Sequence, residues 1–217
     1  MLKSRLRQSE TAKALKVNNK VLVFYKERLA LLSVPKTGST AYQTALRDRA
    51  DLVVSGPTDL KHANMRRYDR FFQTMFRKMF DTEMEVMAVV REPIDWLGSW
   101  YRYRRRAELA GDAHSTQSLT FDDYLNAYMQ TPRPACADVG CQTEFLQPRS
   151  NGAGVTHVFR YENQDKILHF LQNRLQCDIQ LQRENVSPRC ALELSDQIEQ
   201  RFRSLHGAEF ALHHAAS

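Results

Sequence analysis

Short apolar runs alternate with longer amphipathic stretches along the chain. The apolar runs predict β-strands at residues 21–25, 29–34, 51–55, 85–90 and 155–161. The stretches with helical spacing predict α-helices at residues 41–49, 66–80, 93 to near Gly111, 120–129, 164–175 and 192–206. Strands that alternate with helices are typical of α/β proteins, so we expect a three-layer α/β/α domain with a mainly parallel central sheet.

Several positions sharpen these predictions. The turn at residues 26–28 makes the first two strands either a hairpin or an edge strand followed by a buried strand. Residues 85–90 are almost continuously apolar, as in a buried parallel strand. Thr120 and Asp123 form the pattern of a helix cap. Apolar side chains at helical spacing between residues 66 and 80 are expected in the core: Phe71, Phe72, Met75, Phe76, Met79 and Phe80.

The domain organisation predicted from these elements is simple. Residues 21–212 are expected to form a single domain, preceded by a basic arm at residues 1–20 and followed by a frayed tail at residues 213–217. Residues 107–119 and 131–154 are expected to be long loops, of the kind that form lids or the walls of an acceptor site.

Composition excludes some classes of protein. Of the 217 residues, 42% are hydrophobic and 26% are charged, which argues against intrinsic disorder. No apolar run approaches the ~18 residues that cross a bilayer, and the basic N-terminus lacks the apolar segment of a secretory signal. The four cysteines include no CxxC pair, which disfavours a disulfide scaffold and a structural zinc site. We therefore expect no transmembrane segment and a cytoplasmic location. The net charge of +6 suggests an anionic partner.

The first candidate motif is the loop Pro35-Lys36-Thr37-Gly38-Ser39-Thr40, between a strand and a helix. Gly38 allows the backbone to approach an anion closely, and the N-terminus of the following helix attracts negative charge. Lys36 adds a positive charge, and the hydroxyl groups add donors. The lysine precedes the glycine and no upstream glycine is present, so this is not the ATP-binding or GTP-binding loop GxxxxGK[ST]. From the residues alone, phosphate binding and plain capping of the helix are supported equally.

The second candidate motif begins at Arg91, at the end of the strand at residues 85–90. Its guanidinium group is suited to a forked contact with phosphate. Ser99, Arg102 and Arg106 follow at spacings of three and four residues, which predicts one shared helix face. Residues 104–105 are expected to be part of a solvated basic face. No stacking-aromatic pattern indicates a nucleic-acid partner, so none is expected.

The two motifs together resemble the sulfotransferases that use 3′-phosphoadenosine 5′-phosphosulfate (PAPS), including their bacterial and carbohydrate-type members. Residues 33–40 resemble the family's 5′-phosphosulfate loop, and Arg91-Glu92-Pro93 followed by Ser99 resembles its 3′-phosphate motif. Three further segments resemble the family more loosely: Lys61-His62-Ala63, Phe159-Arg160-Tyr161-Glu162 and Asn185-Val186-Ser187. The chain departs from the family at Trp96, where many members carry a basic residue, and it has no clear copy of the late Arg-Lys-Gly loop.

The resemblance implies a P-loop-like sulfotransferase fold. It also implies in-line transfer of a sulfuryl group from PAPS to a hydroxyl or amine of an acceptor, which leaves 3′,5′-adenosine bisphosphate and needs no metal. Lys36 would be the catalytic cation. His62 would be the general base, because its ordinary pKa is near neutrality, and Asp59 and Asp48 are the substitutes. The residues implied to bind the cofactor are Pro35, Lys36, Thr37, Gly38, Ser39, Thr40, Arg91, Ser99 and Arg189.

The acceptor and two rival functions stay open. Lys61, Arg133 and Arg149 would suit an anionic saccharide as the acceptor. The rivals are a P-loop-type nucleotide kinase, which the missing loop spacing disfavours, and a non-catalytic relative that binds a nucleotide or another anion. Glu162 is expected either to orient a partner or to form a buried salt bridge, and His157 is expected to be structural.

Overall fold

The computed structural model describes residues 21–56, 60, 63–150, 152–181 and 192–217, so the arm expected at residues 1–20 lies outside the described residues. The strands are β1 (Val21–Phe24), β2 (Leu29–Leu32), β3 (Leu52–Val54), β4 (Glu85–Val90) and β5 (His157–Arg160). The α-helices are α2 (Ser39–Leu46), α4 (Met65–Tyr68), α5 (Thr74–Phe80), α6 (Pro93–Arg104), α7 (Phe121–Tyr128), α8 (Gln142–Leu146), α9 (Gln164–Leu175), α10 (Asp196–Leu205) and α11 (Gly207–Ala215). Short helical turns are η1 (Arg47–Arg49), η2 (Asp69–Gln73) and η3 (Ala107–Leu109). Each strand falls within a predicted run, so the α/β class is confirmed.

The strands form one sheet in the order β3-β1-β2-β4-β5. β1 pairs antiparallel with β2 and with β3, whereas β2 with β4 and β4 with β5 pair in parallel. The sheet is therefore mixed, and the expectation of a mainly parallel sheet is wrong. The connection at residues 25–28 is too short for the crossover of roughly a dozen residues that parallel strands need, so β1 and β2 form a hairpin. β2, β3, β4 and β5 still point the same way, and their carboxyl ends share one edge of the sheet.

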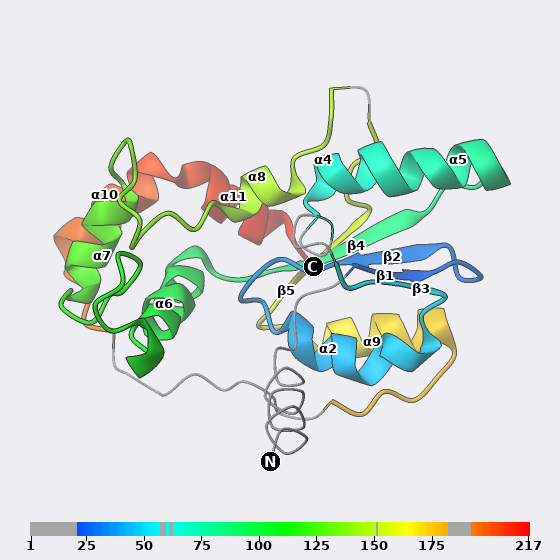
Figure 1. The fold of residues 1–217 in the computed structure, drawn as a ribbon, viewed down its shortest axis with the longest axis horizontal. Coiled ribbons are helices and arrows are strands. Elements are labelled where there is room, and N and C mark those ends of the chain that lie inside the picture. Colours follow the sequence, from blue (N-terminus) through cyan, green and yellow to red (C-terminus); the bar gives the residue numbers. More distant parts are fainter. Residues whose placement is uncertain (1–20, 57–59, 61–62, 151, 182–191) are drawn as a thin grey trace, which may run out of the picture.

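Helices cover both faces of the sheet (Figure 1). Successive residues of a strand face opposite sides, and β1 shows this alternation. Its Leu22 and Phe24 pack with residues of α2 and α9, whereas its Val21 and Val23 pack with residues of α4 and α5. The three layers follow from two separate apolar cores, one on each face.

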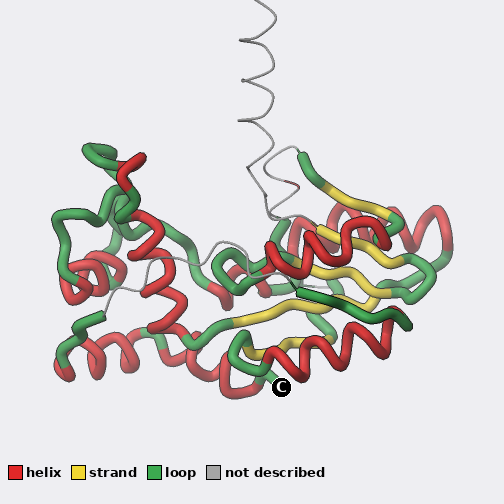
Figure 2. Tube along the Cα trace, turned by 90° about the horizontal axis from the view of Figure 1, so that it is seen from below, coloured by secondary structure: helices red, strands yellow, loops and turns green. Residues whose placement is uncertain are grey.

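A third core lies beyond the carboxyl edge of the sheet and contains only helical and loop residues. It joins α6, α7, α10 and α11 through buried aromatic side chains that include Trp96, Tyr124 and Phe202. Figure 2 shows this group of helices beside the sheet and its covering helices. The Thr120–Asp123 capping box at the start of α7 is present as predicted. No helix in the described part of the chain is long and apolar enough to cross a membrane.

The segment at residues 66–80 is helical, but its apolar stripe is only partly buried. Phe76 is 4% exposed, whereas Phe71, Met79 and Phe80 are 49%, 70% and 50% exposed. The helix contains a π-helical turn, η2, between α4 and α5. The extra residue of a π-turn rotates one part of the helix relative to the other, so a stripe drawn at constant helical spacing does not stay on one face.

The C-terminal residues do not form the frayed tail that was expected. Residues 213–215 belong to α11, and Ser217 exchanges backbone hydrogen bonds with Val158 and Arg160 of β5, both at 3.0 Å. The Arg160 side chain also donates to the carbonyl groups of His213, His214 and Ala216. Two other boundaries differ: α6 ends at Arg104 rather than near Gly111, and α8 lies within the loop predicted at residues 131–154.

Candidate functional site

The loop between β2 and α2 is tightly folded against α6. Lys36 and Gly38 both have positive φ angles, 67° and 71°, which turn the chain from the strand into the helix. The Thr37 hydroxyl donates to the carbonyl of Val34 at 2.8 Å, and the indole N–H of Trp96 donates to the carbonyl of Pro35 at 2.7 Å. Trp96, which departs from the family pattern as a non-basic residue, therefore has a structural part in holding this loop.

Gly38 lies directly beneath the ring of Tyr161, which follows β5. A Cβ atom at position 38 would lie 2.8 Å from Cε2 of that ring. Positive φ and this close approach together require glycine here. Pro35, Thr37 and Gly38 thus shape the turn, while Ser39 and Thr40 are the first residues of α2 and are only partly exposed.

Lys36 points its amine at aromatic rings of α6. Its Nζ lies 3.3 Å from the ring centroid of Tyr103 and 4.9 Å from that of Trp100. Burial lowers the pKa of Lys36 to about 7, and the positive charges of Arg106, Arg104 and Arg91 act in the same direction. This lysine therefore exchanges its proton near neutral pH, and a bound anion would favour its charged form.

Trp100 also carries an unmet hydrogen-bonding demand. Its indole N–H is buried and has no acceptor among the described residues. A buried donor without a partner is costly. The cations around Lys36 fit an anionic group.

Arg91, at the end of β4, joins the two sequence motifs. Its Nη1 donates to the carbonyl of Lys36 at 3.3 Å, and its guanidinium carbon lies 4.5 Å from the ring centroid of Tyr161. The side-chain amide of Gln142, at the start of α8, holds the backbone N–H and carbonyl of Arg91 at 2.9 and 2.8 Å. Lys36 and Arg91 are therefore in direct contact at neighbouring strand ends.

The carboxylate of Asp95 occupies the fork of Arg91. Oδ2 of Asp95 lies 2.6 Å from both Nε and Nη2 of Arg91, and its Oδ1 lies 3.4 Å from Nη2 of Arg102. Asp95 is itself fixed at the start of α6, where its backbone N–H donates to Glu92 at 2.8 Å. The two arginines thus hold an internal anion, on α6, in the position where the resemblance implies a 3′-phosphate.

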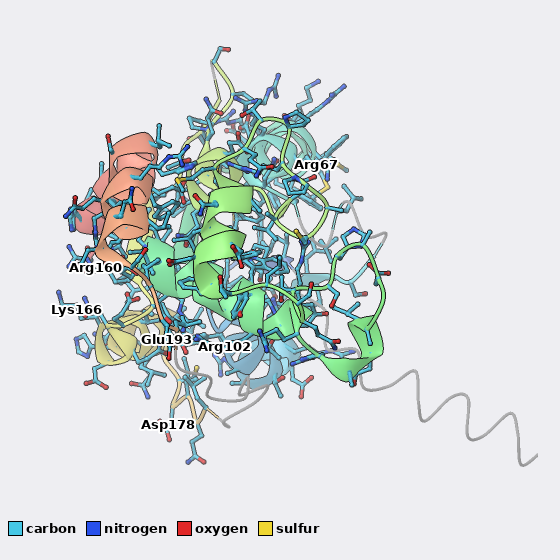
Figure 3. The ribbon with its side chains drawn as sticks, turned by 90° about the vertical axis from the view of Figure 1, so that its left-hand side faces the viewer. Arg67, Arg102, Arg160, Lys166, Asp178 and Glu193 are labelled. Atoms are coloured by element: carbon cyan, nitrogen blue, oxygen red, sulfur yellow. The ribbon has the colours of Figure 1, made fainter. Side chains whose placement is uncertain are left out.

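The second motif does not form one continuous helix face. Ser99, which is 7% exposed, and Arg102 lie on α6, one and two turns beyond Asp95. Arg106 lies past the end of the helix, and its guanidinium carbon is 4.6 Å from the ring centroid of Tyr103. The spacing rule failed at Arg106 because α6 stops at Arg104. Figure 3 views the molecule from this side and labels Arg102.

Of the two arginines expected on a solvated basic face, Arg105 is exposed and Arg104 is buried. Arg104 is only 8% exposed and donates to the carbonyl groups of Ala135 and Asp138 at 2.6 and 3.1 Å. It fixes the loop after α7 and adds its charge to the environment of Lys36. Arg105 is exposed, as predicted.

Of the residues predicted to act as a base, only Asp48 lies in the part of the chain that the structure describes. His62, its neighbour Lys61, the substitute Asp59 and the cofactor residue Arg189 lie outside the described residues. Asp48 is wrong as a substitute, because it is exposed in η1 at the far end of α2. There its neighbour Arg49 donates to Leu175 at the end of α9, so Asp48 lies at the opposite edge of the sheet from Lys36.

The sequence interpretation missed a histidine–carboxylate pair beside Arg91. Nε2 of His213 lies 3.0 Å from Oε2 of Glu162, whose Oε1 accepts the backbone N–H of Glu92 at 2.9 Å. These hydrogen bonds hold the pKa of Glu162 below its ordinary value despite partial burial, which acts in the opposite direction. No signal linked His213 to Glu162, because the two are joined only by the packing of α11. His157 contacts Glu85 at 2.7 Å near the other edge of the sheet, in agreement with a structural role.

In comparisons with known proteins, no family model, no curated protein and no solved structure matches the chain. In the described part of the chain, no group of three or more His, Cys, Asp or Glu side chains is arranged to hold a metal ion.

Proposed function

We propose that the protein is a sulfotransferase that uses PAPS as its donor. The observation that carries the proposal is the contact between the two motifs: the guanidinium group of Arg91 donates to the carbonyl of Lys36. Two cationic strand ends in contact can grip two ends of one doubly phosphorylated nucleotide. The resemblance of both motifs to the PAPS-dependent family supplies the identity of that nucleotide.

In the proposed reaction, the acceptor oxygen or nitrogen forms a bond to sulfur while the bond from sulfur to the 5′-phosphate oxygen breaks. The bridging oxygen keeps the electron pair and leaves on 3′,5′-adenosine bisphosphate, and the acceptor proton passes to the base. Lys36 and the first amides of α2 stabilise the charge that develops on this oxygen. Arg91, Ser99 and Arg102 bind the 3′-phosphate, with Arg189 as a further contact, and His62 is the proposed base, with Asp59 as its substitute.

Binding requires two exchanges in the site. Arg91 and Arg102 must release Asp95 to the extent that they engage the 3′-phosphate. The amine of Lys36 must turn from the ring of Tyr103 toward the 5′-phosphosulfate. Both movements concern side chains, because the backbone of Arg91 is fixed by Gln142 and that of Pro35 by Trp96.

Thermal unfolding with nucleotides tests the proposal, since a ligand that binds only the folded state raises the melting temperature. We expect 3′,5′-adenosine bisphosphate to stabilise the protein without magnesium, and to do so more than ADP or ATP. Arg91→Gln should remove most of this shift, and Lys26→Gln, which removes a positive charge from the exposed β1–β2 turn, should keep it. Equal or stronger stabilisation by ATP with magnesium would refute the proposal and favour the kinase.

A non-catalytic anion-binding relative is the second candidate, and one observation favours it. Arg91 is already paired with Asp95, and the amine of Lys36 already lies against the ring of Tyr103, so both side chains have partners without a ligand. This candidate predicts that 3′,5′-adenosine bisphosphate binds but that labelled PAPS transfers no sulfuryl group to any member of a broad acceptor panel. Transfer that depends on Lys36 would exclude it.

A further inference from the structure

A second concentration of positive charge lies on α4 and η2, away from the Lys36 site. A pocket of about 520 Å³ is lined by Leu60, Arg66, Arg67, Arg70, Phe71 and Arg149. This volume falls within the range of about 300–1,000 Å³ that is usual for small-ligand sites. Among the described residues that line the pocket, four carry guanidinium groups and none is acidic.

The pocket is built by two segments that a buried carboxylate ties together. Asp69 of η2 is 2% exposed and accepts from Nη1 of Arg149 at 3.4 Å and from the backbone N–H of Ala153 at 3.3 Å. A side chain at Gly152 would collide with this carboxylate. The loop after α8 is therefore held against the helix, and Arg149 is placed beside the arginines of α4 and η2. Figure 1 shows this loop next to α4.

Two exposed arginines of α4 and η2 place like charges on the same surface. Arg66 and Arg70 are both exposed and line the same pocket, so their like charges repel each other. The π-turn η2 interrupts the same stretch, and π-turns are frequent at functional sites. An anionic ligand would offset the repulsion between these guanidinium groups.

The pocket shares no residue with the loop that carries Lys36 or with the Arg91 motif, although Leu60 lies two residues before His62, the proposed base. None of its lining residues belongs to the loop at residues 33–40, to α6 or to β4. Arg67 of the pocket and Arg102, which pairs with Asp95, are labelled well apart in the same view (Figure 3). The two groups of cations can therefore bind different anions at the same time.

The lining defines the chemistry of the ligand. Guanidinium groups form forked hydrogen bonds with sulfate and phosphate oxygens, which makes arginine better suited than lysine to such groups. Arg149 already pairs with Asp69, but its guanidinium group remains half-exposed beside those of Arg66 and Arg70, which favours a ligand with several negative charges on one compact molecule. Phe71 is 49% exposed, and with Leu60 it offers an apolar surface to the carbon frame of the ligand.

We propose that this pocket is a binding site for a compact organic polyanion that carries several sulfate or phosphate ester groups. The site is independent of the nucleotide proposed for Lys36 and Arg91. Inositol hexakisphosphate and sucrose octasulfate represent the two sources of this chemistry, and their relative affinities decide between a phosphorylated and a sulfated ligand.

Isothermal titration of the full chain with each probe tests the proposal. We expect saturable binding, with an affinity that falls at least about tenfold in the Arg66→Gln/Arg70→Gln double variant. Both positions are exposed, so the variant should fold, and its melting temperature checks this. The matched control is Arg47→Gln/Lys78→Gln, which removes the same charge from exposed positions outside the pocket and should bind within about twofold of the parent. Lys36→Met should also bind as the parent does.

Three outcomes would overturn the proposal. The first is that neither probe binds. The second is an equal loss of affinity in the control variant or in Lys36→Met, which would indicate general charge attraction or binding at the Lys36 site. The third is tighter binding of a duplex oligonucleotide than of either probe, with the same dependence on Arg66 and Arg70, which would assign the pocket to nucleic acid.

Discussion

Lys36 should make the stability of the protein depend on pH, and its replacement by methionine should remove that dependence. The pKa of Lys36 is about 7 in the folded protein, against an ordinary value of 10.5. Between these values the unfolded chain binds more protons than the folded one, so the free energy of unfolding rises with pH. Below about pH 7 both states hold the proton, and Lys36 contributes no slope. Its destabilising effect is therefore fully present at low pH and is relieved as the pH rises from 7 toward 10.5.

The size of the effect follows from the pKa difference. One proton contributes at most about 1.4 kcal/mol per pH unit. From pH 7.5 to 9.5 the free energy of unfolding can therefore rise by at most about 2.7 kcal/mol, and only a group fully shielded from water would reach this limit. Lys36 is partly exposed, so screening by solvent reduces the expected gain to roughly 1–2 kcal/mol. Lys36→Met keeps an unbranched side chain, one atom shorter, and the Cβ atom at the same positive φ, so the backbone strain is unchanged.

Urea unfolding at pH 6.5, 7.5, 8.5 and 9.5 measures this gain as the difference between the parent protein and Lys36→Met. The subtraction removes the contributions of all other titrating groups. Lys26→Met is the control, because Lys26 is exposed in the β1–β2 turn and should show no such difference. Parallel stability curves for the parent and Lys36→Met would refute the assignment of a lowered pKa to a half-buried Lys36 surrounded by arginines.

Four further predictions concern the proposed nucleotide site. Asp95→Asn should tighten the binding of 3′,5′-adenosine bisphosphate by up to about tenfold in calorimetry, because the competing charge in the fork of Arg91 is removed; weaker binding would contradict the competition. Between pH 7 and 9, above the second phosphate pKa of about 6, the affinity for the bisphosphate should fall by up to about tenfold per pH unit, because Lys36 must take up a proton when the anion binds. Lys36→Arg should abolish this dependence of affinity on pH. Gly38→Ala should lower the free energy of unfolding by about 1–3 kcal/mol in urea titrations, because of its positive φ and the Tyr161 ring; an unchanged midpoint would count against the packing described. His62→Ala should lower turnover about 100-fold in a transfer assay while bisphosphate affinity stays constant, and full activity would place the base elsewhere.

The strands were predictable because apolar runs of five to seven residues are a strong local signal, and each β-strand of the structure falls within such a run. The sheet directions were harder. A hairpin was one of two alternatives for residues 21–34, and the antiparallel pairing of β1 with β3 depends on contacts between strands that no local pattern encodes. The π-turn η2 was invisible for a related reason, since it changes the helical spacing without changing the composition.

The candidate site was predictable in its cations but not in their partners. Lys36 and Arg91 stand out in the sequence because each follows a strand, and the structure places them in contact. Asp95, Tyr103 and Trp100 carry no motif of their own, so their contacts with these cations emerge only from the course of α6. The arginine pocket was missed because Arg149 and Arg66 are far apart in the chain and are joined through the buried Asp69.

The two basic regions differ in how their charge is compensated, and this difference determines how each responds to conditions. At the sheet edge, Arg91 has the carboxylate of Asp95 and Lys36 has the ring of Tyr103, so an incoming anion replaces existing contacts and needs the charged form of Lys36. Binding there should follow pH. In the pocket on α4 and η2, Arg149 pairs with the buried Asp69, but no acidic side chain lines the surface among the described residues, and the like charges of Arg66 and Arg70 share that surface. An anion there adds charge pairing at exposed groups, which salt screens strongly, so binding in the pocket should follow ionic strength rather than the titration of Lys36.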